Sequence, residues 1–317
     1  MKERKRMKKL LAFICLIILS LSLLSGCKSG EYDKGVKLQE EGKYEEAVSV
    51  FEGIEDYEDY KDTAERIDDC NAMIAAIKKY DSSKKAADQK NANLDKAISE
   101  ADALVKKGEK ALDDTLFTKL ETSISSAKAA KQTIPDIPST EKEILSTVSK
   151  IDSIDYTKVL EELSSSQKAL EKSIKQYALV NAPTEAYVIK CLETVEHIDG
   201  ISAVTEDNDP NGNLNKAGGY TATVYFADDR VPADKVEFKG KTIIEKGTDG
   251  GGAIEVYVNE EDVKKRNDYL AGFDGGILAS GSHIVIGTVL VRTSDYLTAS
   301  QQKELEAAIV DALTKVD

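Results

Sequence analysis

Residues that commonly build catalytic or zinc sites are scarce in this 317-residue chain. It has two histidines, His197 and His283, and four cysteines. No His-Glu-x-x-His or Cys-x-x-Cys spacing occurs, which excludes the zinc sites that these spacings form. Ser282 precedes His283 outside any Gly-x-Ser-x-Gly elbow, and as strand neighbours their side chains would diverge. We predict a protein that is not an enzyme. A cell-wall hydrolase is the alternative, because catalytic carboxylates pair in space rather than in sequence.

Long hydrophobic runs are also rare, and the one at residues 10–24 is informative. Its 15 residues are fewer than the roughly 20 that a membrane-spanning helix needs. A basic segment precedes it and small residues follow it. A basic segment, an apolar segment and small residues are the three parts of a secretory signal. The N-terminus therefore predicts export.

The signal ends in Leu24, Ser25, Gly26 and Cys27. This tetrapeptide resembles the lipobox of bacterial lipoproteins. The resemblance implies that the Cys27 thiol carries a diacylglyceryl lipid and that residues 1–26 are removed as a lipoprotein signal peptide. We therefore expect a protein anchored by lipid to the extracytoplasmic face of the cell membrane. An ordinary signal peptide or an uncleaved anchor helix is the alternative.

Acidic residues outnumber basic residues after the signal. Six basic residues and one acid lie in residues 1–26, so 37 basic and 56 acidic residues remain, with a net charge of −19. Such a surface repels nucleic acid and anionic headgroups. We therefore predict no nucleic-acid partner and assign membrane attachment to the lipid, because two acyl chains hold stably where one does not.

Cysteine is too sparse for a disulfide framework. Cys15 lies in the signal and Cys27 is the expected lipid site, which leaves Cys70 and Cys191 in different predicted domains. Two cysteines so far apart do not form a disulfide scaffold. We predict two free, buried thiols, with a single bridge as the alternative.

Residues 27–80 have the pattern of a helical hairpin. The segment Gly42-Lys43-Tyr44-Glu45-Glu46-Ala47, followed by Phe51, comes after an amphipathic stretch with Tyr32, Gly35 and Leu38. It resembles one tetratricopeptide unit, in which a turn glycine joins two antiparallel helices. Stacked repeats need about three units to be stable, and only one is complete. We expect a hairpin extended by one further helix.

Residues 81–180 are rich in helix formers, with apolar residues at helical spacing. Pro135 and Pro138 interrupt the pattern, and Thr140 with Glu143 predicts a new helix start. The stretch 94–130 loosely resembles the FIVAR-type helical modules of bacterial surface proteins. We expect a helical bundle or stalk that acts as a spacer.

Residues 181–317 change character, because most of the glycine and the alternating apolar patterns lie here. We predict helices starting at Thr184, at Asn259 or Glu260, and at Thr298. The expected strands are 201–205, 220–226, 254–258 and 283–292, with a possible edge strand at 242–245. This order predicts an α+β sandwich of ferredoxin-like type. The segments TEDNDPNG, GTDGGG and VIGTVLVRTSD resemble a C-terminal module of exported Gram-positive lipoproteins.

A candidate calcium loop lies at residues 207–213. Asp207, Asp209 and Asn211 would supply side-chain ligands and Asn213 its carbonyl oxygen, as in the first half of an EF-hand loop. The twelfth position is Gly218, where an EF-hand has a bidentate glutamate. Because Asn, Asp, Pro and Gly also favour turns, a hairpin turn is the alternative.

The glycine-rich segment 247–252 lacks the Gly-Lys-Ser/Thr ending of a phosphate-binding loop, and we interpret it as a strand connection.

Together these features predict a lipid-anchored surface protein whose helices present a C-terminal binding module. The expected partners are the membrane, through the lipid, and a protein or glycan ligand of the cell envelope. Alternatively, the helices are the interaction part of an envelope complex and the C-terminal domain is structural.

Overall fold

The computed structural model describes residues 28–276 and 281–316. The predicted signal and anchor residues Leu24, Ser25, Gly26 and Cys27 lie outside this range. Contacts divide the chain into two compact units. The first comprises the described residues up to Asn93 together with Lys131–Tyr156, and the second comprises Leu94–Ala130 with the described residues from Thr157 onward. Among the described residues, no helix is both long and apolar enough to cross a membrane.

The first unit begins with a helical hairpin, as the sequence predicts. Helices α2 (Lys28–Glu40) and α3 (Tyr44–Glu52) are joined at Gly42, whose φ of +75° suits glycine. A Cβ added at Gly35 would lie 2.5 Å from the Phe51 ring, so only glycine allows this close packing. Ala47, Phe51, Ile54, Ile67 and Cys70 form its buried core.

Further helices follow the hairpin, and the proline break is confirmed. A short 3₁₀ turn, η1 (Tyr57–Asp59), leads into the 45-residue helix α4 (Thr63–Lys107), which contributes to both units and runs through the predicted domain boundary at residue 80. Residues 131–138 have no helix, and the Pro135 carbonyl accepts a hydrogen bond from Tyr80 at 2.8 Å. Helix α6 (Glu141–Asp152) then starts with Thr140 as N-cap.

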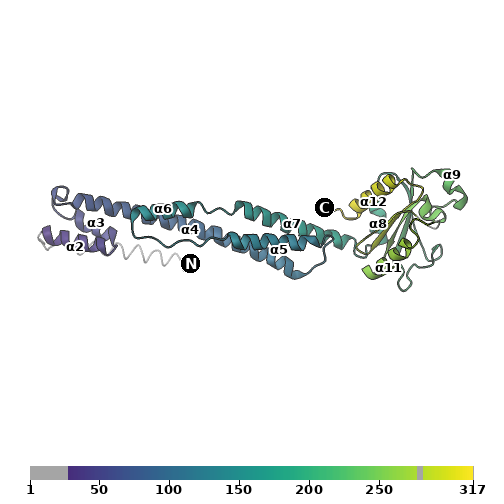
Figure 1. The fold of residues 1–317 in the computed structure, drawn as a ribbon, viewed down its shortest axis with the longest axis horizontal. Coiled ribbons are helices and arrows are strands. Elements are labelled where there is room, and N and C mark those ends of the chain that lie inside the picture. Colours follow the sequence, from purple (N-terminus) through teal and green to yellow (C-terminus); the bar gives the residue numbers. More distant parts are fainter. Residues whose placement is uncertain (1–27, 277–280, 317) are drawn as a thin grey trace. The chain divides into compact units, whose positions relative to one another are not determined.

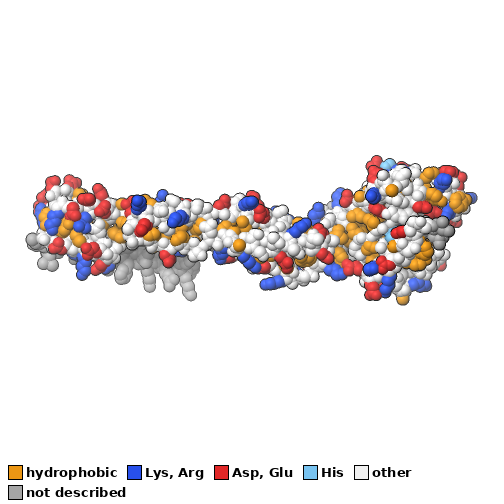
Figure 2. Space-filling view, viewed as in Figure 1, with side chains coloured by type: hydrophobic (Ala, Val, Ile, Leu, Met, Phe, Trp, Pro, Cys, Tyr) orange, Lys and Arg blue, Asp and Glu red, His pale blue; other side chains and the backbone are white. Residues whose placement is uncertain are grey.

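The helical part of the second unit packs by apolar stripes. Helix α5 (Thr115–Ala130) lies along α7 (Thr157–Leu179). Leu120, Ile124 and Ala127 are buried on α5, as are Leu163 and Leu170 on α7, in agreement with the helical spacing of apolar residues in this region. In the face drawn in Figure 2, acidic and basic side chains are intermixed over the helices.

The rest of the second unit is an α+β module with helices on both sides of a five-stranded antiparallel sheet (Figure 1). The strands are β1 (Ile198–Ala203), β2 (Ala222–Asp228), β3 (Gly251–Val256), β4 (His283–Ile286) and β5 (Val289–Thr293). Helices α8 (Glu185–Leu192) and α12 (Ala299–Leu313) pack on one face, and α11 (Glu260–Ala271) packs on the other. Short elements α9 (Ala233–Val236), η2 (Glu237–Lys239), α10 (Ile243–Lys246) and η3 (Gly247–Gly250) connect β2 to β3.

The structure confirms an all-α region followed by an α+β domain, but the sheet does not have the predicted ferredoxin-like topology. The strand order is β1-β2-β3-β5-β4. In the expected βαββαβ arrangement, helices connect strands that are not neighbours in the sheet. Here β1 and β2 are neighbours joined by a long loop, so the first βαβ unit is missing.

Two strand predictions are wrong for local reasons. The expected edge strand 242–245 is the start of α10, where Thr242 and Glu245 form a reciprocal capping box. The expected long strand 283–292 is the hairpin β4–β5, because Gly287 turns the chain at a φ of +57°. The N-caps Thr184, Asn259 and Thr298 are confirmed.

The turn of the β4–β5 hairpin is hydrogen-bonded to the residues that follow α7. The Val180 carbonyl accepts hydrogen bonds from the Thr288 backbone N–H at 3.0 Å and from its hydroxyl at 3.2 Å. The Ala182 N–H in turn donates to the Thr288 hydroxyl oxygen at 2.6 Å. A Cβ at Gly287 would lie 2.6 Å from the Val180 carbonyl oxygen. The helix end and the turn therefore touch backbone to backbone.

Candidate functional site

Strand alternation gives the sheet two different faces. One, here called the apolar face, carries Val224, Phe226, Ile254, Val256 and Val291 against α8 and α12. The other, here called the polar face, carries the intervening residues of the same strands together with the residue after β3. Its polar members are Thr223, Tyr225, Glu255, Tyr257 and Arg292, and the apolar Ala253 and Leu290 lie among them. Helix α11 covers the polar face, which makes these polar side chains buried rather than solvent-facing.

Glu255 is the centre of the polar face. Its carboxylate is fully buried and accepts hydrogen bonds from Arg292 Nη1 at 2.9 Å and from the Tyr257 hydroxyl at 2.7 Å. Arg266 of α11 donates from Nε at 3.1 Å and from Nη2 at 3.3 Å, one to each carboxylate oxygen. One buried acid thus holds two guanidinium groups in place.

These contacts shift the pKa values of the network. Burial alone would raise the pKa of Glu255, but the charges of Arg292 and Arg266 outweigh it and hold the pKa below its ordinary value. Burial, together with the nearby Glu255 charge, raises the pKa values of Tyr257 and Tyr225. At neutral pH the network therefore consists of a carboxylate, two guanidinium cations and neutral phenols.

A cavity of about 480 Å³ opens over this network, within the range of small-molecule sites. Arg292 and Tyr225 line it from the sheet, and Arg266, Tyr269, Leu270 and Phe273 line it from α11 and the residues just after it. Tyr269 is 59% exposed and packs edge-to-face with Phe273 at 5.1 Å between ring centroids. The remaining wall contains Pro210, Asn211, Lys239, Ile244, Glu245, Lys246, Gly247, Thr248 and Asp249.

The predicted calcium loop forms one wall of this cavity. Asp209 accepts hydrogen bonds from the backbone N–H groups of Asn211 at 3.0 Å, Asn213 at 2.6 Å and Leu214 at 2.8 Å, and from the Tyr220 hydroxyl. Burial raises the pKa of Asp209, but these bonds more than compensate and lower it overall. Asp209 therefore organises the loop and places Asn211 beside Tyr225, where Nδ2 donates to the phenol oxygen at 3.4 Å.

The side chains of the predicted calcium ligands Asp207 and Asn213 do not help Asp209 to hold the loop. Asp207 is exposed, and Asn213 takes part through its backbone N–H. Within residues 28–276 and 281–316, no group of three or more His, Cys, Asp or Glu side chains is arranged to hold a metal ion. The predicted ligand set has only two carboxylates, so calcium at this loop stays a prediction.

The histidines and cysteines have structural surroundings. His283 Nδ1 contacts Asn267 Oδ1 at 2.8 Å and Nε2 contacts Asp274 Oδ1 at 3.3 Å, so both ring nitrogens are engaged by residues other than Ser282. Cys70 and Cys191 are free and buried, as predicted.

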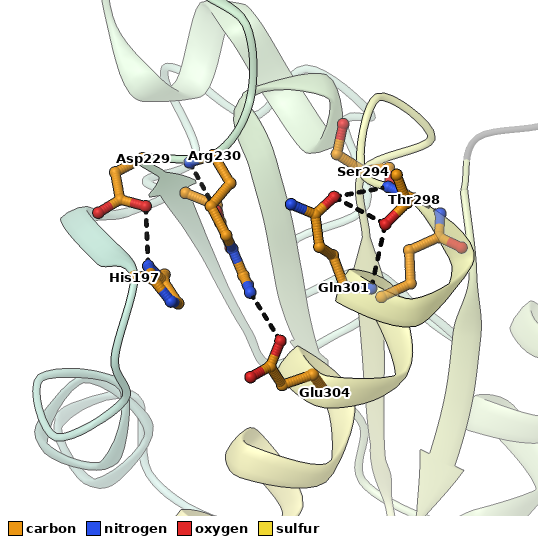
Figure 3. A network of polar contacts seen from close by, with 9 residues as sticks. His197, Asp229, Arg230, Ser294, Thr298, Gln301 and Glu304 are labelled. Carbon is orange, nitrogen blue, oxygen red and sulfur yellow. Dashed lines mark hydrogen bonds and ion pairs between the residues drawn. The ribbon is translucent and has the colours of Figure 1, made fainter.

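A second polar network lies at the α12 side of the sheet (Figure 3). Arg230 donates to the buried carboxylate of Asp228 from Nε at 3.0 Å and from Nη2 at 2.8 Å, and its Nη1 donates to Glu304 of α12 at 3.1 Å. His197 lies beside it and contacts Asp229 at 2.9 Å. This network ties the turn after β2 to α12, and Glu304 is an exposed site suited to control substitutions.

Sequence reasoning missed Glu255, Arg266 and Arg292 as a group. Glu255 and Arg292 each interrupt an apolar strand, and a charged residue within such a strand is the one signal that could have marked the polar face.

No protein-family model matches this chain, and no curated protein or solved structure is similar enough to count as a match.

Proposed function

We propose that the protein is a lipid-anchored surface protein of the cell envelope whose α+β module binds a ligand in the cavity of its polar face. The observation that carries this proposal is that a buried acid, Glu255, fixes two arginines under a cavity with an aromatic rim. Recognition sites commonly contain a few precisely placed polar groups that fix the orientation of the ligand. The ligand would belong to a protein or a glycan of the cell wall.

The helical part would act as a spacer in this proposal. The α2–α3 hairpin packs Gly35 against Phe51 in the manner of a tetratricopeptide unit, and α5 and α7 would supply the FIVAR-like stretch. The lipid on Cys27 would fix the chain to the membrane, which its excess of acidic residues could not do.

The binding function is tested with the mature chain without its lipid-bearing Cys27, residues 28–317, equilibrated with a solubilised cell-envelope fraction. Bound molecules are eluted and quantified by mass spectrometry. We expect the wild type and Glu304→Gln to retain the same molecule and Tyr269→Ala to retain much less, because Tyr269 lines the cavity and Glu304 does not. Equal retention by all three proteins, or none by folded wild type, would contradict the proposal.

The anchor is tested separately by growth with labelled fatty acid. We expect label on the wild-type protein and its recovery with membranes, and neither for Cys27→Ala. A labelled Cys27→Ala protein would rule out this lipid site.

A further inference from the structure

The polar groups of the cavity define the charge of what it can bind. Four cations line it, Arg266, Arg292, Lys239 and Lys246, with two acids, Glu245 and Asp249. Even when the buried Glu255 behind the wall is included, the site is positive. The whole chain, by contrast, has a net charge of −14. A locally positive cavity on an acidic protein favours an anion.

The acids at the site are already held by donors of the protein. Asp249 pairs with Lys239 at 2.6 Å. Glu245 accepts the backbone N–H groups of Lys241 and Thr242, both at 2.8 Å. Glu255 is shared by two arginines and Tyr257. A cationic ligand would therefore compete with donors that the protein already supplies.

Three donor groups that line the cavity have no acceptor among the described residues. Arg266 uses Nε and Nη2 on Glu255, and its Nη1 group makes no hydrogen bond to any residue in the described ranges. The Tyr225 oxygen accepts from Asn211, and its hydrogen has no acceptor among the residues that the structure describes. Lys246 likewise has no acidic partner there. Arg266 and Tyr225 are largely buried, and buried donors need acceptors, so a ligand with acceptor oxygens suits the site.

The remaining surface of the cavity is apolar and aromatic. Tyr269 and Phe273 form its rim, and the Arg266 guanidinium carbon lies 5.5 Å from the Tyr269 ring centroid. Leu270 and Ile244 extend this surface. An exposed aromatic pair beside a guanidinium suits a flat apolar group joined to an anion.

We propose that the cavity binds a chemical group of its ligand in which a carboxylate or phosphate, held by Arg266 and Tyr225, is joined to an apolar body that packs on Tyr269 and Phe273. This inference rests on the proposed binding function and names its ligand class. The anionic group could belong to a carboxylic acid or to a phosphate ester, and the two sources have distinct probes.

The test titrates the mature chain with 3-phenylpropionate, phenyl phosphate and phenethylammonium, followed by amide NMR shifts. We expect at least one anion to bind about tenfold or more tightly than the cation, because a charge-assisted hydrogen bond is worth about 1.5–3 kcal/mol. The tighter anion identifies the source. Binding should weaken with salt, and shifts should map to α11 and to the loop around Asn211. Equal or tighter binding of phenethylammonium, or shifts elsewhere, would overturn the proposal.

Variants separate a specific site from general charge attraction. Arg266→Gln should weaken the anion about tenfold or more, and the exposed Glu304→Gln should leave it unchanged. If Arg266→Gln does not fold, Tyr269→Ala decides, with an expected loss of about threefold to tenfold. Unchanged affinity in a folded Tyr269→Ala protein would overturn the proposal. A retained envelope molecule without anion binding rejects this ligand class alone, whereas failure of both experiments rejects the binding function as well.

Discussion

The two faces of the C-terminal sheet are built by the same strands and have opposite chemistry. Ile254 and Glu255 are adjacent in β3, and both are fully buried. Ile254 contributes to an apolar core under α8 and α12, whereas Glu255 anchors two arginines and a tyrosine under α11. Burying a charge is costly unless it is paired, and hydrophobic residues could fill the same space. The polar face therefore points to a use other than stability alone.

The largest effect on stability is expected for the substitution Glu255→Gln. Removing the carboxylate charge takes the Glu255 counter-charge away from two largely buried guanidinium groups, and we expect a loss of about 3–5 kcal/mol. Hydrogen exchange of the β3 and β5 amides measures this loss within the sheet. A loss below about 1 kcal/mol would mean that the arginines relax to solvent and that the polar face is not a rigid network.

A second test concerns the loop that borders the polar face. Hydrogen bonds hold the pKa of Asp209 below its ordinary value despite burial, so its stabilisation is present at neutral pH and lost as pH falls through the folded-state pKa. We expect Asp209→Asn to cost about 1.5–3 kcal/mol at neutral pH. The difference from wild type should shrink in acid, as followed by exchange of the Leu214 amide. A pH-independent difference would contradict the charged role of Asp209.

The calcium prediction has its own measurement at this loop. Because Asp209 already accepts four hydrogen bonds, calcium would have to compete with them. A melting temperature raised by calcium over chelator, and no longer raised in Asp207→Ala, would support calcium. An unchanged melting temperature would remove it.

A smaller effect is expected from Ile254→Val on the apolar face. Loss of one buried methyl group should cost about 0.5–1.5 kcal/mol and leave binding of the anionic probes unchanged. The same exchange and titration experiments measure both quantities. A clear change in affinity would show that the two faces are not independent.

The smallest effect is expected at the exposed start of α11. Glu260 contacts Lys110 at 2.7 Å and Tyr177 at 2.8 Å, and all of these contacts are at the surface. Because surface ion pairs contribute little, Glu260→Gln should cost about 0–1 kcal/mol. A loss as large as that of Glu255→Gln would remove the distinction between the buried network and surface pairs.

The sequence predicted much of the secondary structure because the signals are local. Alternation marks 220–226 and 254–258, and Thr140, Thr184 and Thr298 mark helix starts. The same kind of signal was present at Thr242 and Glu245 but was interpreted as a strand. Burial of β2 and β3 on both faces does not follow from their alternating pattern, which is typical of strands with one buried face.

The candidate site could not be predicted in the same way. Glu255, Arg266 and Arg292 come from β3, α11 and β5, and only the covering of the sheet by α11 shows that they meet. The loop 207–213 was singled out for its oxygen-rich composition, but its observed contacts are those of a turn that positions Asn211 beside Tyr225. Long-range packing, which leaves no periodic pattern, decides both.

The contact between Val180 and Thr288 has a mechanical consequence. Helix α7 ends at Leu179, and the next residues are bonded to the β4–β5 turn with no slack chain between them. We therefore expect a rotation of α7 to move the hairpin, whose second strand contains Arg292. The backbone bonds at Thr288 would couple the orientation of the helix to the strand that carries one of the cavity's arginines.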